Sequence, residues 1–128
     1  MNLVLHGRPI TKKNHQQIVT CGGRPRIIQA QRYKEYAQSC TFQIGLTGMN
    51  KMQISSPVNL RCVYYMPTRH KVDLVNLLEA TCDILVGAGV LADDNSNIIA
   101  AHDGCRVAYD KYDPRVEITI EPLTNTEV

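Results

Sequence analysis

The chain has 128 residues, of which 14 are Lys or Arg and 12 are Asp or Glu, so the formal net charge is +2. Its length and its 44% content of hydrophobic residues are sufficient for one folded domain and argue against wholesale disorder. No apolar run approaches the roughly 18 residues of a membrane helix. Five dispersed cysteines and an N-terminus without signal-peptide features predict reduced thiols in a cytoplasmic protein.

The near-neutral total hides an uneven distribution of charge along the chain. Residues 1–72 contain eleven basic side chains and a single acid, Glu35, whereas residues 73–128 contain three basic side chains and eleven acids. Such a division predicts a basic surface for a polyanion beside an acidic cluster with another function.

The N-terminal third of the chain predicts short strands. An apolar run predicts a strand over residues 2–6, which the turn residues Gly7-Arg8-Pro9 end. Residues 17–20 and 26–29 flank a glycine pair and predict a hairpin, because glycines supply the positive φ of a tight turn.

A helix, a linker and the best strand of the first half follow. Apolar residues recur at spacings of three and four from Ala30 to about Leu46, which predicts an amphipathic helix. Residues 49–56 are expected to be a linker. Strict alternation predicts a strand over 58–66 with one apolar face, formed by Val58, Leu60, Cys62 and Tyr64.

The second half opens with the strongest predicted helix, residues 73–86. Asp73 is a natural N-cap, and Gly87-Ala88-Gly89 ends the segment. A turn over 90–95 and strands over 97–107 and 115–121 complete the prediction, with 122–128 as a C-terminal tail. The element order predicts a single α+β domain, residues 1–121, with a small mixed or antiparallel sheet and two main helices.

Carboxylates gather on one side of the second predicted helix. A helical wheel places Asp73, Asn76, Glu79 and Asp83 opposite an apolar face, which contains Leu74, Val75, Leu77, Leu78, Cys82, Leu85 and Val86. Glu79 and Asp83 are four residues apart, and their like charges cost about 0.2–0.5 kcal/mol unless a cation is bound. Carboxylates are ligands that Mg²⁺ accepts. From the pattern alone, however, a helix cap, a solvated face and a turn at Asp93-Asp94-Asn95 explain these residues more simply.

A longer pattern resembles the RusA-type Holliday-junction resolvases. The stretch 71–80, KVDLVNLLEA, followed by Asp83 and Asp93-Asp94, is similar to that family's basic loop, D-x-D-N-L-x-K-A motif, further aspartate and D-D pair. The segments Gly7-Arg8-Pro9 and Lys12-Lys13-Asn14 resemble the family's opening strand and basic segment. The resemblance implies a RusA-like fold, a homodimer, cleavage of four-way DNA junctions with Mg²⁺ or Mn²⁺, and a prophage origin.

The resemblance can be carried over residue by residue, with two departures. Asp73, Asn76 and Asp94 match the first aspartate, the asparagine and the second residue of the D-D pair, but Val75 replaces an aspartate and Glu79 replaces the lysine. Glu79 lies one turn beyond position 75, and helical side chains lean toward the N-terminus. We therefore hypothesise that Asp73, Glu79 and Asp94 form the catalytic metal site.

Further residues complete the predicted site. Asp83 and Asp93 are alternative or outer ligands, and Lys71 and Arg69 are candidates for replacing the motif lysine. Basic and polar side chains are predicted to bind DNA, mostly at phosphates: Lys12, Lys13, Arg24, Arg26, Arg69, His70, Lys71 and Asn76. Taken singly these are ordinary surface residues, and their clustering carries the prediction.

The expected function is that of a magnesium-dependent endodeoxyribonuclease which resolves four-way junctions in recombination and repair, without a small-molecule cofactor. A twofold-symmetric junction requires paired cuts, which favours a homodimer. Two alternatives remain open: a branched-DNA-binding protein that has lost cleavage through Val75 and Glu79, and a nuclease for another structured nucleic acid.

Overall fold

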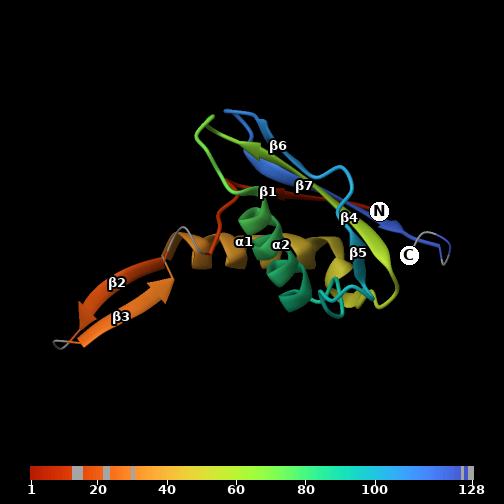
Figure 1. Cartoon of the computed structure of the whole chain (residues 1–128), viewed down its shortest axis with the longest axis horizontal. Coiled ribbons are helices and arrows are strands. Elements are labelled where there is room, and N and C mark those ends of the chain that lie inside the picture. Colours follow the sequence, from red (N-terminus) through yellow and green to blue (C-terminus); the bar gives the residue numbers. More distant parts are fainter. Residues whose placement is uncertain (13–15, 22–23, 30, 125, 127–128) are drawn as a thin grey trace.

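A five-stranded mixed sheet organises the computed structural model, which describes residues 1–12, 16–21, 24–29, 31–124 and 126. Strand β7 lies between β1 and β4 and is antiparallel to both, whereas β5 and β6 pair in parallel with the other edge of β4 (Figure 1). The strands are β1 (Asn2–His6), β4 (Val58–Met66), β5 (Ile99–Ala101), β6 (Arg106–Tyr109) and β7 (Arg115–Pro122).

Two helices cover the same face of this sheet, α1 (Gln31–Thr47) and α2 (Leu74–Gly87) (Figure 1). The predicted hairpin is confirmed as an antiparallel pair, β2 (Gln16–Cys21) and β3 (Arg24–Gln29). The predicted α+β fold with a small mixed sheet and two main helices is thus confirmed. No helix among the described residues is long and apolar enough to cross a membrane.

Alternation along the strands produces the core. The predicted inward residues of β4 are all buried, and they face buried residues of β7 and β1 such as Ile118 and Leu5. The Tyr64 hydroxyl lies 2.6 Å from the Thr81 hydroxyl of α2, which in turn donates to the Leu77 carbonyl. This buried pair satisfies its own polar groups, and it joins α2 to the centre of the sheet.

The prediction of one continuous strand over 97–107 was wrong, because a turn separates β5 from β6. The buried side chain of Asn59 holds this turn: its Nδ2 donates to the Asp103 carbonyl at 3.1 Å, and its Oδ1 accepts from the Asp103 amide at 2.7 Å. Gly104 has a φ of +89°, and a Cβ there would lie 2.6 Å from Arg61 Cδ. A strand conformation is incompatible with both features.

The predicted linker (49–56) and the start of the predicted tail (122–128) both contain ordered secondary structure or backbone hydrogen bonds. Within the predicted linker 49–56 there is a short 3₁₀ helix, η2 (Met49–Lys51), and Ile54 forms a parallel bridge with Leu91. At the other end β7 runs to Pro122, and the Leu123 amide donates to the Pro57 carbonyl at 3.0 Å. The boundary of the domain at residue 121 stays a prediction.

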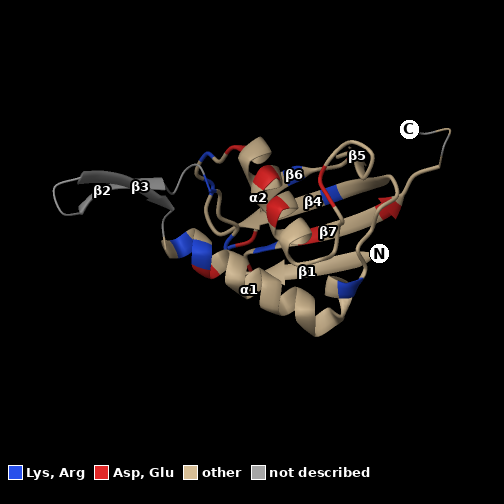
Figure 2. Ribbon diagram, turned by 90° about the horizontal axis from the view of Figure 1, so that it is seen from below, with Lys and Arg blue, Asp and Glu red and all other residues tan. Residues whose placement is uncertain are grey.

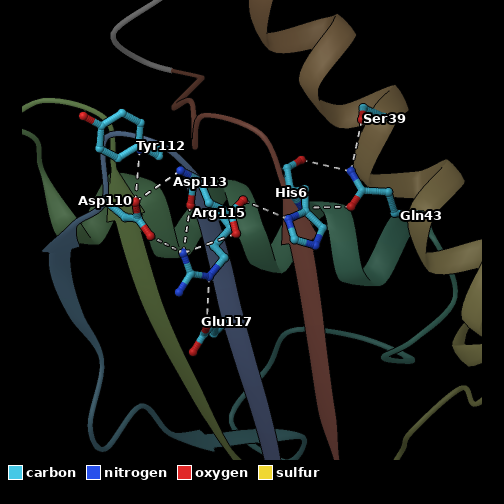
Figure 3. Close-up of polar contacts among 8 residues, drawn as sticks. All are labelled: His6, Ser39, Gln43, Asp110, Tyr112, Asp113, Arg115 and Glu117. Carbon is cyan, nitrogen blue, oxygen red and sulfur yellow. Dashed lines mark hydrogen bonds and ion pairs between the residues drawn. The ribbon is translucent and has the colours of Figure 1, made fainter.

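A network of ion pairs and hydrogen bonds connects the N-terminal end of β7 to β1 and α1 (Figure 3). The Arg115 guanidinium pairs with Asp110 at 2.9 Å and with Glu117 at 2.8 Å, and it lies 4.0 Å from the Tyr65 ring centre. His6 Nδ1 is 3.2 Å from Asp113, and the Gln43 side chain bonds to both backbone polar groups of His6. The hydrogen bond from Arg115 is the main cause that lowers the pKa of Asp110, and hydrogen bonds from the backbone amides of Tyr112 and Asp113 lower it further.

Candidate functional site

The N-terminus of α2 is capped as the sequence predicts. Asp73 has an extended backbone, and its Oδ1 accepts a hydrogen bond of 3.2 Å from the Asn76 amide. An aspartate at this position satisfies a helix amide and interacts favourably with the positive end of the helix dipole. The Asp73 carboxylate is exposed, so capping leaves it accessible to solvent.

The buried face of α2 is rotated relative to the apolar face that the helical wheel predicts. The buried residues of the helix are Leu77, Ala80, Thr81, Cys82, Ile84 and Leu85, so the face that meets the core includes Ala80, Thr81 and Ile84. Val75 lies outside this face and is 69% exposed, so its placement on the apolar face was wrong. Glu79, four residues further on, is exposed as well. The two departures from the family motif are therefore neighbours on the surface of the helix.

An ion pair that the sequence does not reveal lies beside these carboxylates. Lys12 Nζ is 3.0 Å from Asp83 Oδ2 and 5.9 Å from the centre of the Tyr33 ring. The hydrogen bond from Asp83 raises the pKa of Lys12, partial burial opposes the rise, and the charge of Glu79 adds to it. Lys12 thus places a positive charge against the acidic side of α2, near the position where the family motif has its lysine.

Asp93 and Asp94 lie in the exposed loop between α2 and β5. Asp93 Oδ1 accepts from the Asp94 amide at 2.8 Å, and its Oδ2 accepts from Asn95 Nδ2 at 3.2 Å. The loop is anchored at its start by buried Leu91 and at its end by buried Ile98. The Asp93 carboxylate therefore shapes the loop, and Asp94 beside it is exposed as well.

These carboxylates are not assembled into a metal site in this conformation. Among the described residues, no group of three or more His, Cys, Asp or Glu side chains could hold a metal ion. Hard carboxylate oxygens suit Mg²⁺ in kind, but the described side chains do not bring three of them together.

Basic side chains surround a cavity immediately before α2. It has a volume of about 110 Å³, and its lining includes Arg8, His70 and Lys71 together with the hydroxyl-bearing Thr11 and Thr68. Figure 2 shows the same division of charge, with basic segments in the loop leading to α2 and acidic segments on the helix. A cavity of this composition suits a phosphate group.

The structure brings together part of the predicted basic set. His70 and Lys71 line the cavity, and the Arg69 guanidinium lies 4.1 Å from the centre of the Tyr109 ring on β6. Sequence reasoning did not select Arg8 for DNA binding, although its Gly7-Arg8-Pro9 segment was part of the resemblance. The side chains of Lys13, Arg24 and Arg26 lie outside the described residues.

Comparison with known proteins gives one informative result. The search of curated proteins found no match. The model of the family described as Endodeoxyribonuclease RusA matches residues 6–121, nearly the whole chain, including the basic cavity, α2 and the Asp93-Asp94 loop. The chain belongs to the RusA endodeoxyribonuclease family.

Proposed function

We propose that this protein resolves four-way DNA junctions by hydrolysing paired phosphodiester bonds, with Mg²⁺ or Mn²⁺ as its cofactor. The observation that carries the proposal is the position of the basic cavity, directly before the exposed carboxylate of Asp73, in a chain that matches the RusA family from residue 6 to 121. Recombination and repair in the cytoplasm are the proposed setting.

The basic side chains would hold the DNA backbone near the acidic helix. Arg8, His70 and Lys71 come from two segments that are distant in the sequence, and they line the same cavity. Phosphate contacts of this kind orient the DNA and offset its repulsion from the carboxylates of α2. Stacking on Tyr109 orients the Arg69 guanidinium and restricts its rotamers, which favours a defined phosphate contact.

Replacing Arg8 with Ala is expected to weaken junction binding and to reduce its dependence on salt. Loss of one phosphate contact lowers the slope of log affinity against log salt concentration by about 0.9. Fluorescence anisotropy with a labelled junction across a salt series measures both effects. The control is Lys51→Ala, an exposed charge on η2 that is absent from the cavity lining. An unchanged slope in Arg8→Ala would remove Arg8 from the DNA interface.

Asp73, Glu79 and Asp94 are the proposed catalytic and metal-binding residues, with Asp83 and Asp93 in secondary positions. Asp73 and Asp94 match the family motif, and all three proposed catalytic carboxylates are exposed. Asp83 is engaged by Lys12 and Asp93 by its own loop, which supports a secondary role for both.

Glu79→Gln is expected to lower the rate of magnesium-dependent junction cleavage at least about tenfold, equivalent to about 1.4 kcal/mol in activation free energy. The change preserves the shape of an exposed side chain and removes the charge that stands in for the aspartate missing at 75. Single-turnover cleavage of a labelled junction gives the rate. The matched control is Glu35→Gln on α1, the same substitution at another exposed helical site. Equal rates in the two variants would refute the role of Glu79.

A branched-DNA-binding protein without cleavage is the second candidate function. Two observations favour it: Val75 is exposed where the motif has an aspartate, and no group of three potential ligands is assembled in the described part of the chain. In this alternative the basic cavity still binds DNA phosphates, whereas the carboxylates of α2 and the following loop no longer support cleavage.

One assay separates these candidates. The protein is incubated with a synthetic four-way junction, a flap, a structured RNA and a linear duplex, with and without Mg²⁺. Symmetric cuts in the junction support resolution, and tight junction binding without cuts under any cation supports the binding protein. Preferential cutting of the flap or RNA would instead identify a nuclease for another structured substrate.

A homodimer is proposed because a twofold-symmetric junction requires two equivalent active sites. The sheet face opposite the helices, which includes Val63 and Tyr65, and an apolar helix face are its candidate interfaces. Light scattering with and without junction DNA determines the number of subunits.

A further inference from the structure

Three cysteines and a histidine lie close together between β4, α2 and the β5–β6 turn. Cys62 lies on β4 and is fully buried, and Cys105 lies directly before β6 and is partly exposed. Cys82 of α2 is buried, and His102 occupies the start of the β5–β6 turn. The function proposed above uses none of these four side chains.

Cys62 and Cys105 are positioned to form a disulfide bond with each other. The Cys62 amide donates to Cys105 Sγ at 3.2 Å. Val63 and Arg106 are register partners in the parallel pair of β4 and β6, so the two cysteines lie opposite each other one position earlier. Neighbouring strands are about 4.8 Å apart. This separation falls within the Cα distances of about 4.4–6.8 Å that a disulfide spans.

His102 completes the surroundings of Cys105. Its Nδ1 lies 2.9 Å from the Leu60 carbonyl and 3.9 Å from Cys105 Sγ, and the same sulfur is 3.3 Å from that carbonyl. Hydrogen bonding from the Cys62 thiol lowers the pKa of Cys105, burial opposes this, and His102 lowers it further through a hydrogen bond and its charge. Contacts with Cys105 and Cys82 raise the pKa of His102. Such surroundings favour the thiolate, which is the nucleophilic form of cysteine.

We infer that Cys105 is an oxidative modification site for hydroperoxides, with Cys62 as the thiol that converts the first product into a disulfide. The Cys105 thiolate attacks the terminal peroxide oxygen and the O–O bond breaks, which yields a sulfenic acid. The leaving group is hydroxide from hydrogen peroxide, which is protonated to water, or alkoxide from an organic hydroperoxide, which is protonated to alcohol. The Cys62 sulfur then attacks the Cys105 sulfur and loses its proton, and the sulfenic hydroxyl leaves as water. In total, the two sulfurs are oxidised by two electrons and the peroxide is reduced.

The partial exposure of Cys105 distinguishes it from the other cysteines with described side chains, since Cys40, Cys62 and Cys82 are all buried. Cys40 shows the opposite effect to Cys105, because burial raises the pKa of its thiol to about 11. An oxidant in solution therefore reaches Cys105 before these three buried cysteines. The adjacent Cys62 thiol then reacts with the sulfenic acid in competition with its further oxidation.

The test treats the full chain with hydrogen peroxide, then blocks the remaining thiols and digests the protein with trypsin plus a protease that cleaves before Asp. This digestion separates Cys62 (62–69), Cys82 (73–82) and Cys105 (103–106) into different peptides. The expected product is 62–69 joined to 103–106, with loss of two hydrogen atoms. Cys62→Ala is expected to accumulate a sulfenic acid on Cys105 that dimedone traps, and Cys105→Ser to abolish both products.

Cys40→Ser is the matched control, since it alters a fully buried cysteine of α1 and should leave the joined peptide unchanged. Circular dichroism checks the fold of each variant, and the wild-type peptide map tests the proposal even if a variant fails to fold. Folded wild-type protein in which Cys105 remains a free thiol would overturn the proposal. A disulfide from Cys105 to Cys82 would overturn the assignment of Cys62.

Discussion

Asp94→Asn is expected to reduce junction cleavage by at least about a hundredfold, equivalent to about 3 kcal/mol in activation free energy, while junction binding is retained. Asp94 is exposed in the loop before β5, and we propose it as a catalytic residue because it lies where the RusA motif is expected to have the second residue of its aspartate pair. The substitution preserves shape and removes one negative charge. Because that charge repels phosphates, DNA affinity should stay equal or rise. Single-turnover cleavage and anisotropy measure the two effects separately.

Two neighbouring aspartates serve as controls for this variant. Asp103→Asn changes an exposed side chain in the β5–β6 turn, where the backbone of Asp103, and not its carboxylate, bonds to Asn59, so cleavage should be unaffected. Asp93→Asn should have a smaller effect than Asp94→Asn, since the Asp93 carboxylate is engaged within its own loop. Wild-type cleavage by Asp94→Asn would exclude Asp94 from catalysis.

Leu85→Ala is expected to lower the free energy of unfolding by about 2–5 kcal/mol. Leu85 is fully buried on α2, and its carbonyl accepts the Val90 amide at 2.9 Å at the end of the helix. Truncation leaves a cavity beneath the helix that carries Asp73, Glu79 and Asp83. Urea denaturation followed by circular dichroism measures the change, with an unchanged dependence on urea concentration as evidence that the unfolding reaction is the same.

Leu46→Ala provides the matched comparison for Leu85. It is the same substitution in a helix, but Leu46 is 73% exposed on α1, so the change should stay within about 0.5 kcal/mol. A loss below about 1 kcal/mol for Leu85→Ala would show that α2 is less firmly packed against the sheet than its burial indicates.

Periodicity predicted much of the fold because it reports local geometry. The strand β4, the helix α2 with its Asp73 cap, and the hairpin β2–β3 were all found near the predicted positions. The errors arose where the local structure depends on contacts with residues that are distant in the sequence. The turn that interrupts 97–107 depends on the side chain of Asn59, more than forty residues earlier in the chain. Likewise, the exposure of Val75 depends on which side of α2 meets the sheet.

The sequence by itself determined the α+β class, the motif that marks a RusA-type chain and the change of charge between Lys71 and Asp73, because these depend on residue type and spacing. Only the tertiary structure determined which of the functional side chains lie next to one another. It brought Arg8 from the N-terminal segment into a cavity with His70 and Lys71, paired Lys12 with Asp83, and set Cys62 beside Cys105. Each of these contacts joins residues at least forty positions apart. Such pairs become neighbours only through strand pairing and helix packing, which local patterns do not encode.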